Sequence, residues 1–424
     1  MLFTIFYAMK KILILTLILP FFVTCVRLTN SDDKEPVSIA LSANQTVISK
    51  NGNLNSWALL SLIAQDQLDG DKVKNTVIST LSLNIALAMT WNGAEGETKA
   101  EIQRFLGLGD LSEEEVNDYF KQMLTALPEI DPKVTLSIAN SIWYNNWLKV
   151  YSSFKQANSN YFFAEVTSLN FGDPESLNTI NNWCSNKTNG IIKKVLDNIR
   201  DDEVMFLINA LYFKAPWTIK FDKSKTINSP FYPSEGAAVS APMMTNTDTF
   251  VYSENQGYKT LKLDYGDSAF SIILILPDVD KDINSIVLAV NNPEVWNSIY
   301  THNYTSRVDV KIPRFKFEYN IELNKHLKEL GVKKAFNGSE SELNKIADVG
   351  SEKLYISRIL QKAAIEVNEE GSEAAAVTVV GIGVTSVPMV NTFHAERPFI
   401  FAITENSTGT ILFAGKVENP LLSN

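Results

Sequence analysis

Cysteine and histidine are scarce in this sequence. Its 424 residues include two cysteines, Cys25 and Cys184, and three histidines. Two cysteines cannot staple a disulfide-dense scaffold, and no Cys-x-x-Cys pair is present for metal or redox chemistry. The sequence also lacks a His-Glu-x-x-His helix, a Gly-x-Ser-x-Gly elbow and a Walker-type loop. The common signatures of hydrolases and nucleotide-binding proteins are therefore missing, and we predict no catalytic residue, metal ligand or cofactor.

Positive charge is also in short supply. The 38 lysines and arginines face 48 aspartates and glutamates, which gives a net charge of -10 and a pI near 5.1. Such a chain has no general basic field for nucleic acid or an anionic membrane surface. The 45% of apolar and 10% of aromatic residues are an ordinary globular composition. Length alone suggests two or three domains, although single β-rich domains can be longer.

The first 25 residues have the pattern of a secretory signal. Lys10 and Lys11 precede an apolar run that ends at Cys25, and this run is too short to span a membrane, which takes about 20 apolar residues. The stretch 22–25 resembles a bacterial lipoprotein box, which makes Cys25 a candidate lipid anchor followed by a flexible tether over residues 26–45. The alternative is a plain secreted protein in which Cys25 is removed with the signal. Both readings predict an extracytoplasmic protein, which would touch a membrane only through such an anchor.

Helical and strand patterns are mixed along the rest of the chain, which predicts an α+β fold. Apolar spacing predicts helices over 55–68, 82–89 and 320–330, and a capping box at Ser112 predicts a helix that ends at Pro128. Apolar and β-branched runs predict strands over 134–144, 204–213, 268–276, 399–404 and 411–417. Alternation over 307–317 shifts phase at Pro313, which predicts one strand with a bulge.

Residues 369–388 do not have the pattern of packed core. From Gly371 to Val390 the sequence contains no Lys, Arg or aromatic residue, and its only charge is Glu373. If the segment were extended, one face would be free of charge and the other would carry that acid. The uncharged face would hold Ser372, Ala374, Ala376, Thr378, Val380 and Ile382. The pattern suits a strand buried in a sheet, an exposed loop, or a segment with both states.

Several sequence blocks, in this order, resemble the serpin family. The segment 368–376 resembles the hinge of the reactive loop in inhibitory serpins. The other matching blocks are Ser79-Thr80-Leu81-Ser82, Asn92-Gly93-Ala94, Asn182-Trp183, Thr188-Asn189-Gly190, residues 207–217, Met243-Met244, Ile312-Pro313-Arg314-Phe315, Arg397-Pro398-Phe399 and residues 413–417.

The resemblance covers residues 46–420 and implies a single domain of three β-sheets and eight or nine helices. It implies a monomeric suicide inhibitor of serine, and sometimes cysteine, proteases, and not an enzyme. A protease would attack the exposed loop and form an acyl-enzyme, and the cleaved loop would insert into the central sheet and distort the bound protease. The alternative within the family is a non-inhibitory carrier, storage protein or chaperone.

Family spacing also locates the loop's functional parts. The hinge would comprise Glu369, Glu370, Gly371, Ser372, Glu373, Ala374, Ala375, Ala376 and Val377. The residue before the scissile bond lies sixteen residues beyond Glu369, which places the bond at Thr385-Ser386; Val384 is the second choice. Because the loop has no Lys or Arg, and Val384 and Thr385 are small or β-branched, an elastase-like or subtilisin-like target is expected.

Six further residues match family positions that control opening of the central sheet. They are Arg314, expected to pair with Glu369, Trp217 in the same region, and the polar cluster Ser79, Ser82, Asn209 and Gln361. Gln361 stands where the family usually has histidine, and Thr80 where it usually has proline. Heparin-activated members carry basic residues near 108–129, whereas Glu113, Glu114, Glu115 and Asp118 make this region acidic. Activation by heparin is therefore not expected.

Overall fold

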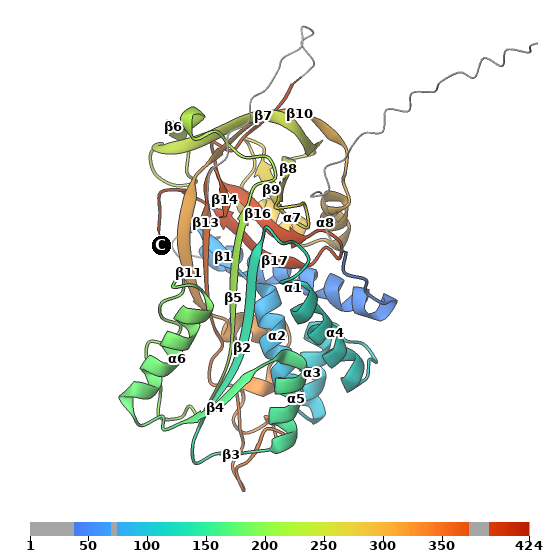
Figure 1. Ribbon diagram of the computed structural model, residues 1–424, viewed down its shortest axis with the longest axis vertical. Coiled ribbons are helices and arrows are strands. Elements are labelled where there is room, and N and C mark those ends of the chain that lie inside the picture. The colour runs from blue at the N-terminus through green and yellow to red at the C-terminus, as the bar shows by residue number, and fades with distance from the viewer. Residues whose placement is uncertain (1–37, 69–73, 373–389, 424) are drawn as a thin grey trace, which may run out of the picture. The chain divides into compact units, whose positions relative to one another are not determined.

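The computed structural model describes residues 38–68, 74–372 and 390–423 (Figure 1). Within these ranges the chain forms nine α-helices. They are α1 (Ala43–Leu68), α2 (Thr80–Trp91), α3 (Gly96–Leu106), α4 (Glu113–Ala126), α5 (Ser152–Phe162), α6 (Pro174–Lys187), α7 (Ile283–Val290), α8 (Pro293–Tyr300) and α9 (Asn324–Glu329). The predicted capping box opens α4, because Ser112 and Glu115 each bond the other's backbone N–H.

The largest sheet has nine strands, each hydrogen-bonded to at least one neighbour. Its order is β1-β17-β16-β9-β8-β7-β10-β15, and β6 pairs with β7. The strands are β1 (Thr76–Ile78), β6 (Ile227–Phe231), β7 (Val239–Asn255), β8 (Tyr258–Tyr265), β9 (Phe270–Pro277), β10 (Thr305–Pro313), β15 (Asn391–His394), β16 (Phe399–Glu405) and β17 (Ile411–Val417). Every residue of β9, β16 and β17 is buried, as their continuous apolar runs indicate.

A four-stranded sheet and a two-stranded sheet lie side by side in the folded domain, and we call them together the central sheet (Figure 1). The first part has the order β14-β5-β2-β4, and the second pairs β11 with β13. The strands are β2 (Thr135–Asn145), β4 (Glu165–Leu169), β5 (Met205–Pro216), β11 (Phe315–Glu322), β13 (Leu360–Val367) and β14 (Gly371–Ser372). A short pair, β3 (Lys149–Val150) and β12 (Ala347–Asp348), lies at the lower end in this view.

Helices cover both faces of β5. On one face Trp183 and Cys184 of α6 pack with Phe206 and Ile208 of β5. Helix α2 lies against the other face and also packs on β17, within the main hydrophobic core. The part of β5 that carries Phe206 and Ile208 therefore lies in a middle layer, with α6 on one face and α2 on the other.

Two sequence predictions fail around residue 313. The predicted bulged strand over 307–317 is two strands in different sheets, because β10 ends at Pro313 and β11 begins at Phe315. Between them, Arg314 donates its backbone N–H to the carbonyl of Pro242. The predicted helix over 320–330 begins later, at Asn324, because residues up to Glu322 pair with β13. Apolar spacing alone could not separate these outcomes, since strand pairing is a tertiary contact.

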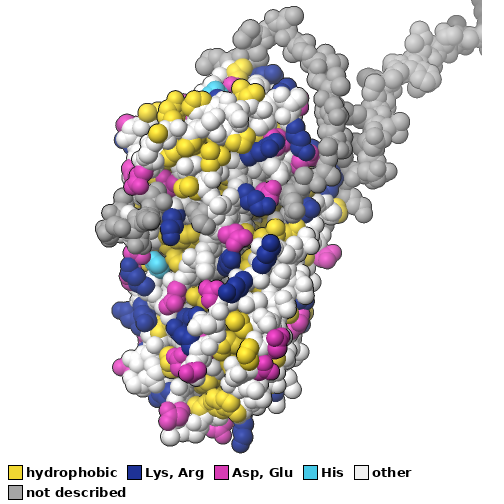
Figure 2. All heavy atoms as spheres, turned by 90° about the vertical axis from the view of Figure 1, so that its left-hand side faces the viewer, with side chains coloured by type: hydrophobic (Ala, Val, Ile, Leu, Met, Phe, Trp, Pro, Cys, Tyr) yellow, Lys and Arg dark blue, Asp and Glu magenta, His cyan; other side chains and the backbone are white. Residues whose placement is uncertain are grey.

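The folded part of the chain begins before residue 46. Helix α1 starts at Ala43, and Ile39 is buried with its N–H donating to the Ser407 hydroxyl at 2.9 Å. Residues 38–45 of the predicted tether therefore contact or join the domain, while the predicted signal and Cys25 lie outside the described residues. No described helix has the length and apolar character needed to cross a membrane. Figure 2 shows acidic and basic side chains intermingled over the face drawn there.

Candidate functional site

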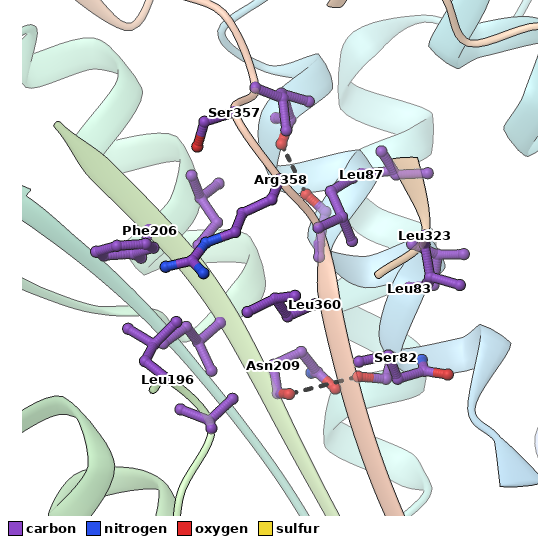
Figure 3. Close-up of a pocket in the computed structure, with 18 of the residues that line it drawn as sticks. Ser82, Leu83, Leu87, Leu196, Phe206, Asn209, Leu323, Ser357, Arg358 and Leu360 are labelled. Carbon is purple, nitrogen blue, oxygen red and sulfur yellow. Dashed lines mark hydrogen bonds between the residues drawn. The ribbon is translucent and has the colours of Figure 1, made fainter. Parts of the chain in front are cut away.

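The candidate site is the space between β5 and β13, which we call the strand slot. Within the described residues no strand pairing joins β5 to β13, although each is paired on its other side. Two cavities lie along the slot, one of about 150 Å³ toward its lower end and one of about 400 Å³ toward its upper end. The lower cavity is lined by β5, β13 and α2 (Figure 3). In the described residues the slot is thus a strand position that is filled only where β14 pairs with β5.

The lower cavity is largely apolar. Leu83 and Leu87 of α2 face it, together with Phe206 of β5 and Leu360 of β13 (Figure 3). Cys184 also lines it, and burial raises the pKa of this thiol to about 11. The thiol therefore stays protonated near neutral pH and is a poor nucleophile.

The hinge already enters the upper end of the slot. Strand β14 pairs antiparallel with β5, with Gly371 opposite Pro216 and Ser372 opposite Ala215. Gly371 has a φ of +131°, and a Cβ there would lie 2.1 Å from the Ala215 carbonyl oxygen, so only glycine fits. The remaining hinge residues, 373–377, and the predicted bond at Thr385-Ser386 with its alternative Val384, lie outside the described residues.

Ser372 shows which way the first hinge residue points. Its side chain is buried, and its hydroxyl lies 3.2 Å from that of Tyr265, which is itself fully buried. The face that the sequence analysis found free of charge therefore begins with a side chain directed into the core.

Glu369 and Arg314 form the predicted ion pair beside this entry point. Arg314 donates from Nε to Glu369 Oε1 at 2.7 Å, and the Glu369 side chain is 1% exposed. Burial alone would raise the pKa of Glu369, but hydrogen bonds from Arg314 and Thr226 outweigh it and hold that pKa below its ordinary value. The carboxylate is thus ionised at neutral pH and ties the hinge to the start of β11.

Trp217 also holds the hinge. Its indole N–H donates to the Asn368 carbonyl at 2.8 Å, and its backbone N–H donates to the Glu370 carbonyl at 2.8 Å. The ring stacks on Tyr265 with centroids 4.4 Å apart. Glu370 in turn pairs with Lys223 at 2.6 Å. The upper end of the slot is therefore the most densely bonded part of the site.

The predicted polar cluster bridges the middle of the slot. Gln361 of β13 bonds Ser79 twice, accepting from its N–H at 3.1 Å and donating to its carbonyl at 2.6 Å. Ser82, one turn along α2, donates to the carbonyl of Asn209 in β5 at 3.4 Å. The N-terminus of α2 is thereby bonded to both edges of the slot, and glutamine takes over these contacts where the family usually has histidine.

The side chain of Asn209 has one hydrogen-bond acceptor without a donor. Its amide N–H donates to Asn140 at 2.6 Å, while its Oδ1 is buried and has no hydrogen-bond partner. A buried polar atom in this state costs about 1–3 kcal/mol. An additional donor arriving in the slot would relieve that cost.

A buried ion pair at the lower end of the slot was not predicted from the sequence. Arg358, just before β13, donates from Nη2 to Glu203 Oε2 at 2.9 Å and to the Asn198 carbonyl at 2.7 Å. Glu203, just before β5, is 0% exposed. One sequence feature could have drawn attention to these two residues. Each is a charged residue that stands two positions before an apolar strand. Their pairing could not be read from the sequence, since 155 residues separate them.

Comparisons with known proteins agree with this geometry. The family model for serpins, the serine protease inhibitors, matches residues 55–420. Human serpin B11 is 32% identical over 368 residues, which is 82% of this chain and 93% of that protein. The native state of the thermophilic serpin tengpin superposes with a TM-score of 0.79 at 32% identity and covers 90% of this chain and 96% of its own.

A structure of human thyroxine-binding globulin in complex with its hormone is also similar. Its TM-score is 0.78 at 25% identity, over 88% of this chain and 99% of that one. The family model alone spans most of the sequence. The predicted α+β architecture is the one observed, and the described residues form nine of the predicted eight or nine helices. The chain therefore belongs to the serpin family.

Proposed function

We propose that the protein inhibits a protease by acting as a suicide substrate, with the strand slot as the destination of the cleaved loop. The observation that carries this proposal is the pairing of Gly371 and Ser372 with β5 at the top of an otherwise unfilled slot. A strand that has begun to form there needs only further residues of the same chain to complete the sheet.

The register of β14 indicates where those residues would go. Each further loop residue would pair with one residue earlier in β5, so Thr378 would come opposite Asn209. On the other side of the slot the bridge between Asn368 and Gly371 would bring Thr378 opposite Gln361. A hydroxyl donor would thus arrive beside the unpartnered Oδ1 of Asn209. This fit supports insertion as the function of the slot.

The composition of the loop fits the same path. Side chains alternate along a strand, so residues that share the direction of Ser372 would face the core. These are Ala374, Ala376, Thr378, Val380 and Ile382, none of which carries a charge. Insertion would therefore bury no ion, which would be costly without a partner. Glu373 would lie on the opposite face.

The chemical step belongs to the protease. Its serine oxygen attacks the carbonyl carbon of Thr385, the bond to the Ser386 nitrogen breaks, and that nitrogen leaves as an amine with the proton supplied by the protease histidine. An ester then links Thr385 to the protease. Water would hydrolyse this ester, unless insertion first carries the protease to the far end of the slot and distorts its active site. The outcome is decided by two competing rates.

The target follows from the residues at the bond. Val384 and Thr385 are small or β-branched, which suits an elastase-like or subtilisin-like pocket, and a cysteine protease of similar preference would also be a candidate. The acidic first turn of α4 offers no basic surface for heparin. No cofactor is required. The protein would act as a monomer, because loop and slot belong to one chain.

A carrier function is the second candidate. It is favoured by the similarity to thyroxine-binding globulin, a serpin solved in complex with thyroxine. That function would not require the loop to insert. The two proposals therefore differ in whether cleavage leads to a covalent complex.

One experiment separates them. The full chain is mixed with an elastase-like serine protease, the products are separated by denaturing electrophoresis, and the released C-terminal peptide is identified by mass. A complex that survives denaturation, with a peptide beginning at Ser386, is the expected result. Cleavage by several proteases without any such complex would contradict inhibition and favour the carrier.

We also propose an extracytoplasmic location, with residues 1–25 as signal, residues 26–37 as tether and an inhibitory domain that begins before residue 46. The lipoprotein box at 22–25 supports a lipid on Cys25. Incorporation of a labelled fatty acid into the wild-type protein but not into Cys25→Ser is expected. Secretion without label would leave Cys25 as part of a removed signal.

A further inference from the structure

The ion pair between Glu203 and Arg358 crosses the lower part of the strand slot. Asn368 and Pro216 both lie opposite Gly371, so the two edges of the slot can be aligned from the top. Arg358 lies ten residues before Asn368, and Phe206 lies ten residues before Pro216. Figure 3 shows the Arg358 side chain extending from the β13 side toward Phe206 on the β5 side. Its guanidinium therefore lies across the slot.

The contacts of this pair cross from one edge to the other. Arg358 bonds Glu203 and the Asn198 carbonyl, which both belong to the segment that leads into β5. Ser357 donates to Glu203 at 3.2 Å from the same side as Arg358. The Glu203 side chain is 0% exposed and that of Arg358 is 10% exposed. A pair buried to this extent is screened little by solvent.

We propose that Arg358 and Glu203 form a gate that must open before the loop can fill the lower half of the slot. The inference rests on the proposed inhibitory function, because it concerns the completion of loop insertion. The gate acts after the hinge has entered and the middle cluster has parted, and Arg358 is a positioning residue that touches neither the protease nor the scissile bond.

The register explains why a full-length strand meets this gate. Carried on from β14, the strand would bring residue 381 opposite Phe206, level with Arg358, and residue 384 opposite Glu203. The predicted bond follows residue 385, so the last residues before the ester must pass the ion pair. While the gate is closed the protease waits near the end of its path, and water has more time to hydrolyse the ester. The gate thereby sets how much protease escapes.

The test compares gate variants with a matched control in the full chain. Arg358→Gln and Glu203→Gln each remove one charge, and in the double variant the second partner of Glu203, Arg200, is 40% exposed and keeps Asp202 at 3.7 Å. Lys194→Gln serves as the control, because Lys194 pairs with Asp197 on the same connecting segment but both side chains are exposed. Each protein is incubated without protease at a temperature at which the wild type loses inhibitory activity over hours. A second measurement gives the moles of inhibitor consumed per mole of protease inactivated.

We expect the double variant to lose inhibitory activity by spontaneous loop insertion about tenfold faster than wild type. If the wild type consumes more than one mole of inhibitor per mole of protease inactivated, the double variant should consume less. The melting temperature of its loop-cleaved form should stay unchanged, because the gate is open in that form. A merely structural pair would instead lower the melting temperature of native and cleaved forms alike.

The proposed gate would be wrong if the double variant matched the wild type both in its rate of spontaneous inactivation and in the moles of inhibitor consumed per mole of protease. A wild type that forms no covalent complex would overturn the inhibitory function instead, so the two failures are distinguishable.

Discussion

The two large sheets of this molecule differ in completeness. In the nine-stranded sheet, β16 pairs along its length with β9 on one side and β17 on the other. In the central sheet β5 pairs with β2 and β13 pairs with β11, and between their facing edges the described residues supply backbone pairing for the two residues of β14. Among the described residues the first sheet has no unfilled strand position, whereas the second has one between β5 and β13.

Insertion of the loop as proposed would stabilise the fold at the strand slot, where β5 and β13 each have an edge without a strand partner in the described residues. Unpaired strand edges are usually blunted or covered, and an inserted strand would satisfy both edges of the slot. Each ladder hydrogen bond contributes about 0.5–1.5 kcal/mol net, so a strand of roughly a dozen residues would add on the order of 10 kcal/mol, apart from apolar burial. The native state would then persist because insertion is slow.

The largest expected effect comes from Ala374→Arg, which prevents the central sheet from being completed. In the inserted strand that we propose, position 374 would share the inward direction of Ser372, and burying an unpaired arginine there would be costly. We expect the variant to be cleaved as a substrate, with its yield of covalent complex reduced about 100-fold or more. Ala375→Arg is the control, because its side chain would lie on the other face. Equal trapping by the Ala374 variant and wild type would mean that the faces are assigned wrongly.

A second variant measures how long the inserted strand must be. Thr385→Arg places a cation before the predicted bond, which a trypsin-like pocket requires. We expect inhibition of trypsin to appear, with a released peptide that begins at Ser386. Cleavage mapped to another bond, with no gain in trypsin inhibition, would move the end of the strand away from Thr385.

A smaller effect is expected at the middle of the slot. Gln361→Ala removes both bonds to Ser79, at a cost of roughly 1–3 kcal/mol to the native state. The melting temperature should fall by a few degrees, and spontaneous inactivation should accelerate. Lys362→Ala, next along β13, removes a partly exposed pair with Glu318 and no bond to Ser79, and it should change little. If both variants behave alike, the contact between Gln361 and Ser79 does not hold the slot closed.

The smallest expected effect is a faster loss of inhibitory activity at low pH. The pKa of Glu369 is lowered in the folded protein, so its contribution to stability is present in full above its unfolded value and is lost as the pH falls through the folded value. Loss of inhibitory activity on standing should therefore accelerate below about pH 4. Glu369→Gln should remove this acid-dependent part. A wild-type profile identical to that of the variant would show that the pair with Arg314 does not hold the hinge.

The two regions also differ in how far the sequence predicted them. Strands β9, β16 and β17 were expected from continuous apolar runs, and the α4 cap was expected from Ser112 and Glu115, because these signals are local. The change of sheet at Pro313 was read as a bulge, since a strand does not reveal its partner. The ion pair at Glu203 and Arg358 was missed for the same reason. The pairing of Glu369 with Arg314 was found only through the resemblance to a family.

Amide hydrogen exchange before and after loop cleavage tests the central claim most directly. Peptides from β5 and β13 are compared with peptides from β9, β16 and β17 in the same samples, and protease inhibition is recorded in parallel. Cleavage is expected to slow exchange strongly along β5 and β13, as the new strand pairs with both edges, and to leave exchange in the nine-stranded sheet unchanged. Exchange in β5 and β13 that stays as fast after cleavage as before would contradict it.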